Sequence, residues 1–144
     1  MVVGFDEHFN YYKLAKAQHY LLNPACLFLA TNTDHTYPDS DRTLPGTGCF
    51  VAALEACTGR AATIIGKPSR LAFEALQKAH PGIRAERTLM IGDKMQTDIV
   101  FGKQCNMRTI LVESGVHKRD DLAAVPPYEH PDLVISSLGC LTDL

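Results

Sequence analysis

The sequence predicts an α/β protein with parallel strands. Short apolar segments alternate along the chain with segments in which apolar residues recur every three or four positions. Several apolar segments run directly into polar residues, among them Asn32, Lys67 and Asp93. Strands that alternate with helices form parallel sheets through right-handed crossovers, and such sheets bind ligands beyond the carboxyl ends of their strands. The polar residues that follow the strands are therefore the candidates for function.

The first part of the chain predicts a β-α-β-α-β unit. Its first helix should end at Asn23-Pro24, and its second at Thr58-Gly59. Between them, residues 31–46 are polar and contain prolines, so we expect a loop there. The expected strands are 2–5, 26–30 and 62–65, and the expected helices are 10–22 and 47–56.

The second part repeats the pattern in a more regular form. Ser69 is a plausible N-cap for the helix that follows it, and His80-Pro81-Gly82 should end that helix. The expected helices are 70–79 and 97–105, with a short helical piece near 120–124, and the expected strands are 88–91, 108–112 and 133–135.

The composition excludes several classes of protein. The chain has 144 residues, 46% hydrophobic and 21% charged, which suits a soluble domain with a core. A net charge of -2 and a pI near 6.3 argue against a nucleic-acid partner, since no basic stripe exists to neutralise phosphates. No apolar run approaches the roughly 20 residues that cross a bilayer, and no signal peptide is recognisable. We expect a cytoplasmic protein without membrane contact.

Five cysteines form an odd set without a close pair. Each lies in or beside an apolar segment, so we interpret them as reduced packing residues. They are Cys26, Cys49, Cys57, Cys105 and Cys140.

Two carboxylates follow the strand expected at 88–91. Asp93 comes at its end, and Asp98 comes five residues later at the start of the next helix. Mg²⁺ needs only one or two carboxylates besides water and phosphate oxygens, so Asp93 could be a direct ligand with Asp98 behind it. The alternative is that Asp98 only caps the helix and Asp93 only ends the strand.

A lysine stands at the end of another expected strand, immediately before a helix. Lys67, in Gly66-Lys67-Pro68-Ser69, could neutralise a phosphate with help from the helix dipole. A lone loop lysine is usually a solvated surface charge. Together with Gly92-Asp93, however, the pattern predicts a lysine and a carboxylate on adjacent parallel strands, close enough to share one ligand.

These motifs resemble those of a known family. Gly66-Lys67-Pro68-Ser69 and Gly92-Asp93-Lys94-Met95-Gln96-Thr97-Asp98-Ile99 look like the third and fourth motifs of the haloacid-dehalogenase (HAD) superfamily. Ala30-Thr31-Asn32-Thr33-Asp34 and Pro45-Gly46-Thr47-Gly48 are similar to the large α/β cap of its phosphoglycolate, pyridoxal phosphate and 4-nitrophenyl phosphate phosphatases. The resemblance implies a partial cap domain at residues 1–61 and the second half of a Rossmann-like HAD core at 62–144.

The resemblance also implies roles for single residues. Lys67 would stabilise an aspartyl-phosphate, Asp93 would coordinate Mg²⁺, and Asp98 would support this catalytic site from behind. Lys94 stands where the family usually has arginine, which keeps the charge but loses the planar fork. The implied substrate is a small phosphorylated metabolite, and the cap loop that would bind it carries Asn32, Asp34, Tyr37 and Arg42.

The nucleophile of this chemistry should lie in a strand that ends in D-x-D-x-[TV]. No strand predicted here ends in that pattern, and the nearest imitation, Gly4-Phe5-Asp6-Glu7-His8, has histidine at the third position. We therefore expect a truncated chain that is inactive alone. The strand at 88–91 would then have an unpaired edge, so we expect the chain to self-associate or to pair with a missing N-terminal segment.

Two functions remain open from the sequence. The first is a Mg²⁺-dependent phosphomonoesterase whose cap motifs lie marginally closer to the phosphoglycolate type. The second is a non-catalytic module that binds phosphate or a partner chain, which the missing nucleophile favours.

Overall fold

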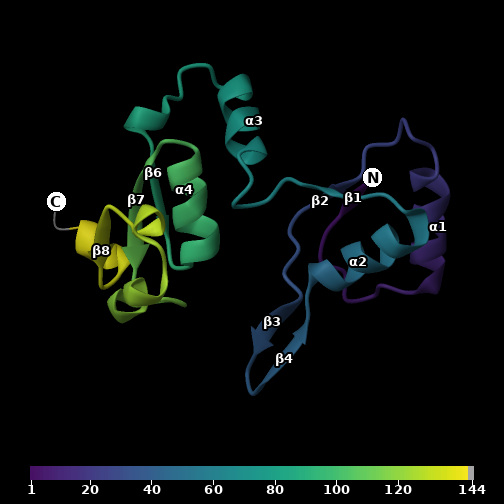
Figure 1. The fold of residues 1–144 in the computed structure, drawn as a ribbon, viewed down its shortest axis with the longest axis horizontal. Coiled ribbons are helices and arrows are strands. Elements are labelled where there is room, and N and C mark those ends of the chain that lie inside the picture. The colour runs from purple at the N-terminus through teal and green to yellow at the C-terminus, as the bar shows by residue number, and fades with distance from the viewer. Residues whose placement is uncertain (143–144) are drawn as a thin grey trace. The chain divides into compact units, whose positions relative to one another are not determined.

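The computed structural model describes residues 1–142 of the chain. The chain divides into two compact units, Met1–Gly66 and Lys67–Leu144, and each is described by itself (Figure 1). Both units contain helices and a parallel sheet, which confirms the predicted α/β class.

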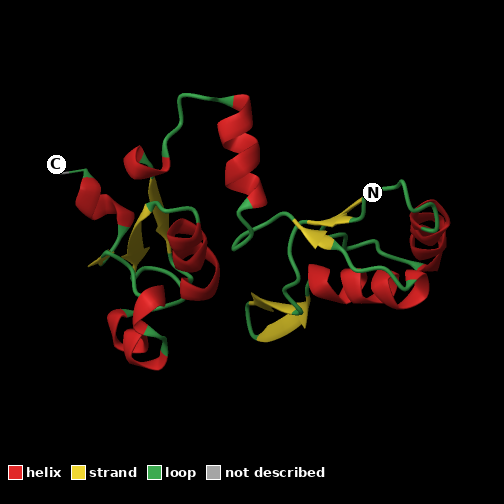
Figure 2. Cartoon of the chain, turned by 45° about the horizontal axis from the view of Figure 1, so that its top comes forward, coloured by secondary structure: helices red, strands yellow, loops and turns green. Residues whose placement is uncertain are grey.

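The first unit is built on a parallel sheet in the order β1-β2-β5, with helices α1 and α2 packed against each other (Figure 2). Its core lies between the sheet and these helices and includes Leu21, Phe28 and Leu54, which are almost fully buried. The elements are β1 (Val2–Val3), α1 (Tyr11–Leu21), β2 (Leu29–Ala30), β3 (Thr36–Asp39), β4 (Arg42–Pro45), α2 (Thr47–Thr58) and β5 (Thr63–Ile64).

Local chemistry explains where the two helices begin and end. The side chain of Asn10 accepts a hydrogen bond from the backbone N–H of Lys13 at 3.1 Å, which caps the start of α1. At the end of α2, Gly59 adopts a left-handed conformation with a φ of 66°, which glycine tolerates best. Both ends agree with the predicted helices to within about two residues, the usual uncertainty of helix boundaries.

The expected loop at 31–46 is wrong in its second part. Strands β3 and β4 form an antiparallel hairpin, in which Thr36 pairs with Pro45 and Asp39 pairs with Arg42. The polar residues and Pro38 hide the alternation that would otherwise predict strands.

The two compact units meet a few residues after the predicted domain border at residue 61. Strand β5, which we expected to open the second domain, pairs in parallel with β2. The backbone N–H of Ile65 donates to the carbonyl of Ala30 at 2.9 Å, so the sheet of the first unit extends to this point. The chain changes unit at Gly66–Lys67 instead.

The second unit contains a parallel sheet in the order β6-β7-β8. Phe73 of α3 packs with Phe101 and Met107 in one core cluster, and Met95, Ile99 and Leu111 form another. Strand β6 is an edge strand among the described residues, as expected, and Leu89 on it is 45% exposed. The elements are α3 (Leu71–Ala79), β6 (Leu89–Gly92), α4 (Val100–Gln104), β7 (Arg108–Val112) and β8 (Leu133–Ile135), with short 3-10 and π-helical turns in the connecting segments.

The five cysteines are free thiols, as predicted, but they do not all pack in a core. Cys105 is buried, whereas Cys49 and Cys140 are exposed, so the packing interpretation is wrong for these two. No helix within residues 1–142 is both long and apolar enough to cross a membrane.

Candidate active site

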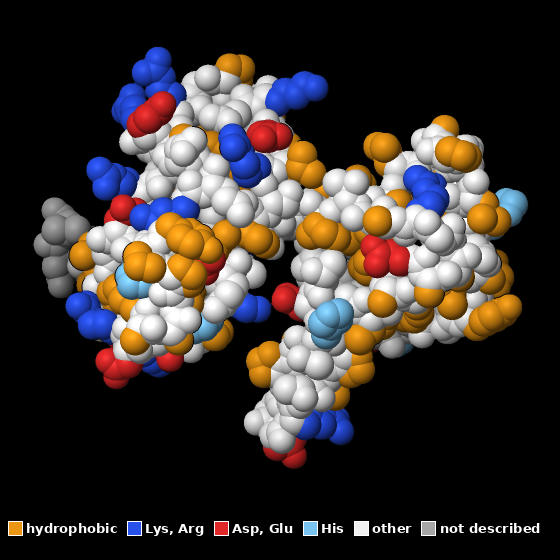
Figure 3. All heavy atoms as spheres, in the orientation of Figure 1, with side chains coloured by type: hydrophobic (Ala, Val, Ile, Leu, Met, Phe, Trp, Pro, Cys, Tyr) orange, Lys and Arg blue, Asp and Glu red, His pale blue; other side chains and the backbone are white. Residues whose placement is uncertain are grey.

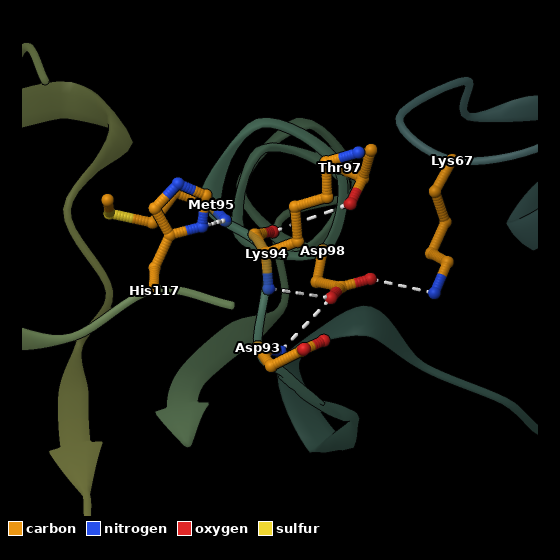
Figure 4. A network of polar contacts seen from close by, with 7 residues as sticks. All are labelled: Lys67, Asp93, Lys94, Met95, Thr97, Asp98 and His117. Atoms are coloured by element: carbon orange, nitrogen blue, oxygen red, sulfur yellow. Dashed lines mark hydrogen bonds and ion pairs between the residues drawn. The ribbon is translucent and has the colours of Figure 1, made fainter. Parts of the chain in front are cut away.

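A compact turn follows β6 and carries both predicted carboxylates (Figure 4). Residues Met95–Ile99 form a π-helical turn that leads into α4, so Asp98 lies inside this turn rather than at the start of an α-helix. A Cβ atom at position 92 would lie 2.4 Å from the Asp98 side chain. Glycine at 92 therefore lets the Asp98 carboxylate fold back over the end of the strand.

The carboxylate of Asp98 organises this turn. Its Oδ2 accepts hydrogen bonds from the backbone N–H groups of Asp93 and Lys94, both at 3.1 Å. Its Oδ1 accepts from Lys67 Nζ at 2.7 Å. The Asp98 side chain is 7% exposed, whereas that of Lys67 is 48% exposed. A buried carboxylate with an ion-pair partner and two backbone donors is fully satisfied, and it links Lys67 to the backbone of Asp93 and Lys94.

Lys67 reaches this centre by a route that the sequence did not predict. It follows β5, which belongs to the sheet β1-β2-β5, whereas Asp93 follows β6 in the other sheet. The prediction of adjacent parallel strands is therefore wrong. The predicted closeness of Lys67 to the carboxylates is nonetheless present, through the ion pair with Asp98.

A loop from the neighbouring strand covers Asp93. This loop follows β7, and parallel pairing brings the ends of β6 and β7 to the same edge. The backbone N–H of Val116 donates to Asp93 Oδ2 at 3.0 Å, and the N–H of His117 donates to the Asp93 carbonyl at 3.0 Å. Within residues 1–142 no donor contacts the other carboxylate oxygen, Oδ1, which leaves that atom for a cation.

The second candidate region is a hollow of about 230 Å³ in the first unit. Asn32, Asp34 and Tyr37, predicted as substrate-binding residues, line it together. Arg42 does not line it and lies 3.9 Å from Asp39 in the hairpin instead. Phe5, Gly46 and Thr47 complete the lining, and the rings of Phe5 and Tyr37 meet edge to face with centroids 5.1 Å apart.

Glycines give this hollow its shape. A Cβ atom on Gly46 would lie 2.2 Å from the Asp34 carbonyl oxygen, and one on Gly48 would lie 2.4 Å from that of Thr33. The start of α2 can therefore approach the loop 33–36 only because both positions lack a side chain. Two backbone hydrogen bonds join the start of α2 to this loop. The Gly46 N–H donates to the His35 carbonyl at 2.7 Å, and the Gly48 N–H donates to the Asp34 carbonyl at 2.9 Å.

The letters of the nucleophile pattern do occur, in Asp39-Ser40-Asp41-Arg42-Thr43, which sequence reasoning passed over inside the expected loop. The structure places them at the tip of the β3–β4 hairpin, where Asp39 pairs with Arg42 and Ser40-Asp41 form the turn. All five residues are exposed. An exposed antiparallel turn does not hold a carboxylate as the end of a buried parallel strand does, so this match is one of letters only.

A family model described as HAD-hydrolase-like matches residues 64–141 of the chain. This stretch contains Lys67, Asp93, Asp98 and the loop that covers Asp93. The chain belongs to the HAD-hydrolase-like family.

Relatives within this family are phosphatases. The chain is 47% identical over 123 residues to "Glycerol-3-phosphate phosphatase" of Rattus norvegicus, which covers 85% of this chain and 38% of that protein. The structure of a p-nitrophenyl phosphatase from Archaeoglobus fulgidus matches 99% of this chain and 55% of its own, with a TM-score of 0.83 and 31% identity. A glycerol phosphate phosphatase from Mycobacterium tuberculosis, solved with magnesium, matches 97% of this chain and 41% of its own, with a TM-score of 0.82 and 29% identity.

The chain thus spans about half the length, or less, of the relatives that it matches. Within that half, the residues present fit part of a magnesium site. Within residues 1–142, no hydrogen bond to Asp93 Oδ1 is shown, and Mg²⁺ can take a single oxygen from an aspartate when water and phosphate supply the remaining ligands. No group of three or more His, Cys, Asp or Glu side chains that could hold a metal is found within residues 1–142.

Sequence reasoning missed the residues that act through their backbone or shape. A Cβ atom on Gly115 would lie 2.0 Å from Asp93 Oδ2, and the N–H of Val116 touches the same oxygen. Neither contact leaves a charged or polar letter in the sequence. Phe5 and Thr47 were missed as lining residues because they read as strand and helix positions.

Proposed function

We propose that this chain carries the charge-stabilising and metal-holding half of a Mg²⁺-dependent phosphomonoesterase site. The observation that supports it is the arrangement of Lys67, Asp98 and Asp93, in which one buried carboxylate fixes both the lysine and the backbone of the metal ligand. Preorganised charges of this kind stabilise a phosphoryl group during transfer, because they need no rearrangement when charge develops.

Each residue has a distinct task in this proposal. Lys67 Nζ, held by Asp98 but still 48% exposed along its side chain, neutralises a phosphate oxygen. Asp93 Oδ1 binds Mg²⁺, which when present neutralises charge on the phosphate and polarises it. Asp98 contacts neither the phosphate nor the cation in this proposal, and it positions Lys67 and Asp93. Asn32, Asp34 and Tyr37, which line the hollow of the first unit, are the proposed substrate-binding residues of that unit.

The substrate class is a small phosphate monoester. Glycerol phosphate and 4-nitrophenyl phosphate, which name the relatives, join phosphoglycolate as candidates.

The chain alone should not turn over, because its D-x-D-x-T letters lie in an exposed hairpin. The test joins the N-terminal part of the rat relative, up to the start of the matched region, in front of Met1. We expect this chimera to release phosphate from 4-nitrophenyl phosphate with Mg²⁺, and Asp93→Asn or Lys67→Met to abolish the release. Asp39→Asn should leave it unchanged.

The alternative, a non-catalytic module, makes the opposite prediction. A folded chimera without Mg²⁺-dependent turnover would favour it, as would unchanged turnover in Asp93→Asn. Turnover by the 144-residue chain itself that is lost in Asp39→Asn would contradict our account of the hairpin.

A further inference from the structure

His117 makes two contacts with the turn after β6, and neither belongs to the proposed chemistry. Its ring Nδ1 lies 3.3 Å from the backbone nitrogen of Met95 and accepts that N–H (Figure 4). Its own backbone N–H donates to the Asp93 carbonyl. His117 therefore ties the loop after β7 to the two peptide groups of the turn that flank Lys94.

The side-chain contact fixes the chemical form of the ring. A nitrogen that accepts an N–H carries no proton, so the proton of the neutral imidazole lies on Nε2. In the close-up, the ring lies beside Met95, on the side of the turn away from Lys67 and the Asp98 carboxylate. The imidazole is therefore placed to hold the loop and is not placed to bind the cation itself.

Holding the loop determines how Asp93 can bind a metal. The neighbouring Val116 N–H engages Asp93 Oδ2 at 3.0 Å, and Gly115 packs so closely on that oxygen that no Cβ would fit. The backbone donor thus engages Oδ2, and no hydrogen bond to Oδ1 is shown within residues 1–142, so Oδ1 is the oxygen that we expect to bind a cation. Mg²⁺ accepts single carboxylate oxygens in octahedral geometry, whereas Ca²⁺ often takes both oxygens of a carboxylate.

We propose that His117 is a positioning residue that clamps the 115–117 loop onto Asp93 and so makes the site selective for Mg²⁺ over Ca²⁺. The inference rests on the proposed function, because it takes Asp93 as a metal ligand. His117 lies outside the motif residues, and loss of its ring should change the ion preference of the site.

The test uses the intact 144-residue chain labelled with ¹⁵N. His117→Phe keeps a ring of similar size but removes the acceptor, and His117→Asn restores an acceptor at the position of Nδ1. His130→Phe is the matched control, because His130 is also half-buried and its Nε2 contacts a backbone group, the Val125 carbonyl at 3.1 Å. Three readouts are compared: the imidazole ¹⁵N shifts, the exchange rates of the Met95 and Val116 amides, and the affinities for Mg²⁺ and Ca²⁺ measured separately.

We expect the ¹⁵N shifts to report an Nε2–H tautomer for His117. In His117→Phe both amides should exchange faster and Mg²⁺ affinity should fall about tenfold, as for other residues that support metal ligands, while Ca²⁺ affinity falls less. His117→Asn and His130→Phe should keep the ratio of Mg²⁺ affinity to Ca²⁺ affinity that the unmodified chain has. An Nδ1–H tautomer, or a His117→Phe variant with an unchanged ratio, would overturn the inference. Failure of the unmodified chain to bind Mg²⁺ would instead overturn the metal site of the proposed function.

Discussion

The turns after β2 and β6 occupy equivalent places, each at the carboxyl end of a parallel strand, yet they are held in different ways. After β6, a buried carboxylate receives a lysine and two backbone N–H groups. After β2, Asn32 Oδ1 accepts the N–H of Asp34, and the loop packs closely against Gly46 and Gly48 at the start of the next helix. The first turn is fixed by charge and the second by close backbone packing. A turn fixed by charge suits the stabilisation of a phosphoryl group, which every phosphate ester shares. A packed loop suits recognition of the rest of the substrate, which differs between esters.

The largest effect that tests this difference comes from Asp98→Ala. Removal of the carboxylate leaves two backbone donors and a lysine without their acceptor, which should lower the free energy of unfolding of the second unit by about 3 kcal/mol. Hydrogen exchange should show that the amides of β6 and β7 lose protection, while the amides of the first unit keep theirs. Asp120→Ala, an exposed acid of the same unit, is the control. Equal protection in both variants would mean that the turn is not fixed by charge.

The second effect comes from Gly115→Ala. The added Cβ would overlap Asp93 Oδ2, so either the loop or the carboxylate must move, at a cost of about 1–3 kcal/mol. We expect weaker Mg²⁺ binding and faster exchange of the Val116 amide. Gly82→Ala, where a Cβ meets nothing within 4 Å, should change neither. Retained Mg²⁺ affinity in Gly115→Ala would contradict the close approach.

The opposite end of the second sheet predicts a pH effect. Burial alone would raise the pKa of Asp132, but hydrogen bonds from Thr109 and Lys103, together with the Lys103 charge, outweigh it and lower the pKa to about 2. A lowered folded-state pKa gives stability that is present above the unfolded pKa of about 3.9 and is lost as the pH falls toward 2.

The loss should be at most about 2 kcal/mol, because the Asp132 side chain is 29% exposed. Urea unfolding between pH 5 and pH 2 measures it, with Asp132→Asn as the comparison. The two proteins should converge in stability as the pH falls. A constant difference across this range would show that Asp132 acts through packing instead of charge.

The smallest effect concerns the edge of β6. Exposed apolar side chains are scattered over the face seen in Figure 3, and Leu89, which is exposed, lies on an edge strand among the described residues. We expect concentration-dependent self-association by sedimentation, weakened several-fold in Leu89→Lys because a charge on an edge strand opposes strand pairing. A monomeric chain with well-protected β6 amides would contradict this prediction.

The sequence predicted the charge-fixed region better than the packed one. Lys67, Asp93 and Asp98 could be found because charged residues after apolar strands leave a visible pattern. The hairpin β3–β4 could not, since Pro38 and its polar neighbours mask the strand alternation. The contacts of Gly115, Val116 and His117 with the turn after β6 depend on backbone donors and on the absence of a side chain at Gly115. The residue types alone therefore do not predict these contacts. The position of β5 depends on which strands pair, which is decided by tertiary packing.

The central claim is that Asp93 holds a cation beside Lys67. The most direct measurement is a Mg²⁺ titration of the ¹⁵N-labelled 144-residue chain, followed at the backbone amides. We expect weak, saturable shifts centred on Asp93 and Val116 in the unmodified chain and their loss in Asp93→Asn. Shifts of equal size in Asp93→Asn, or shifts confined to the first unit, would contradict the claim.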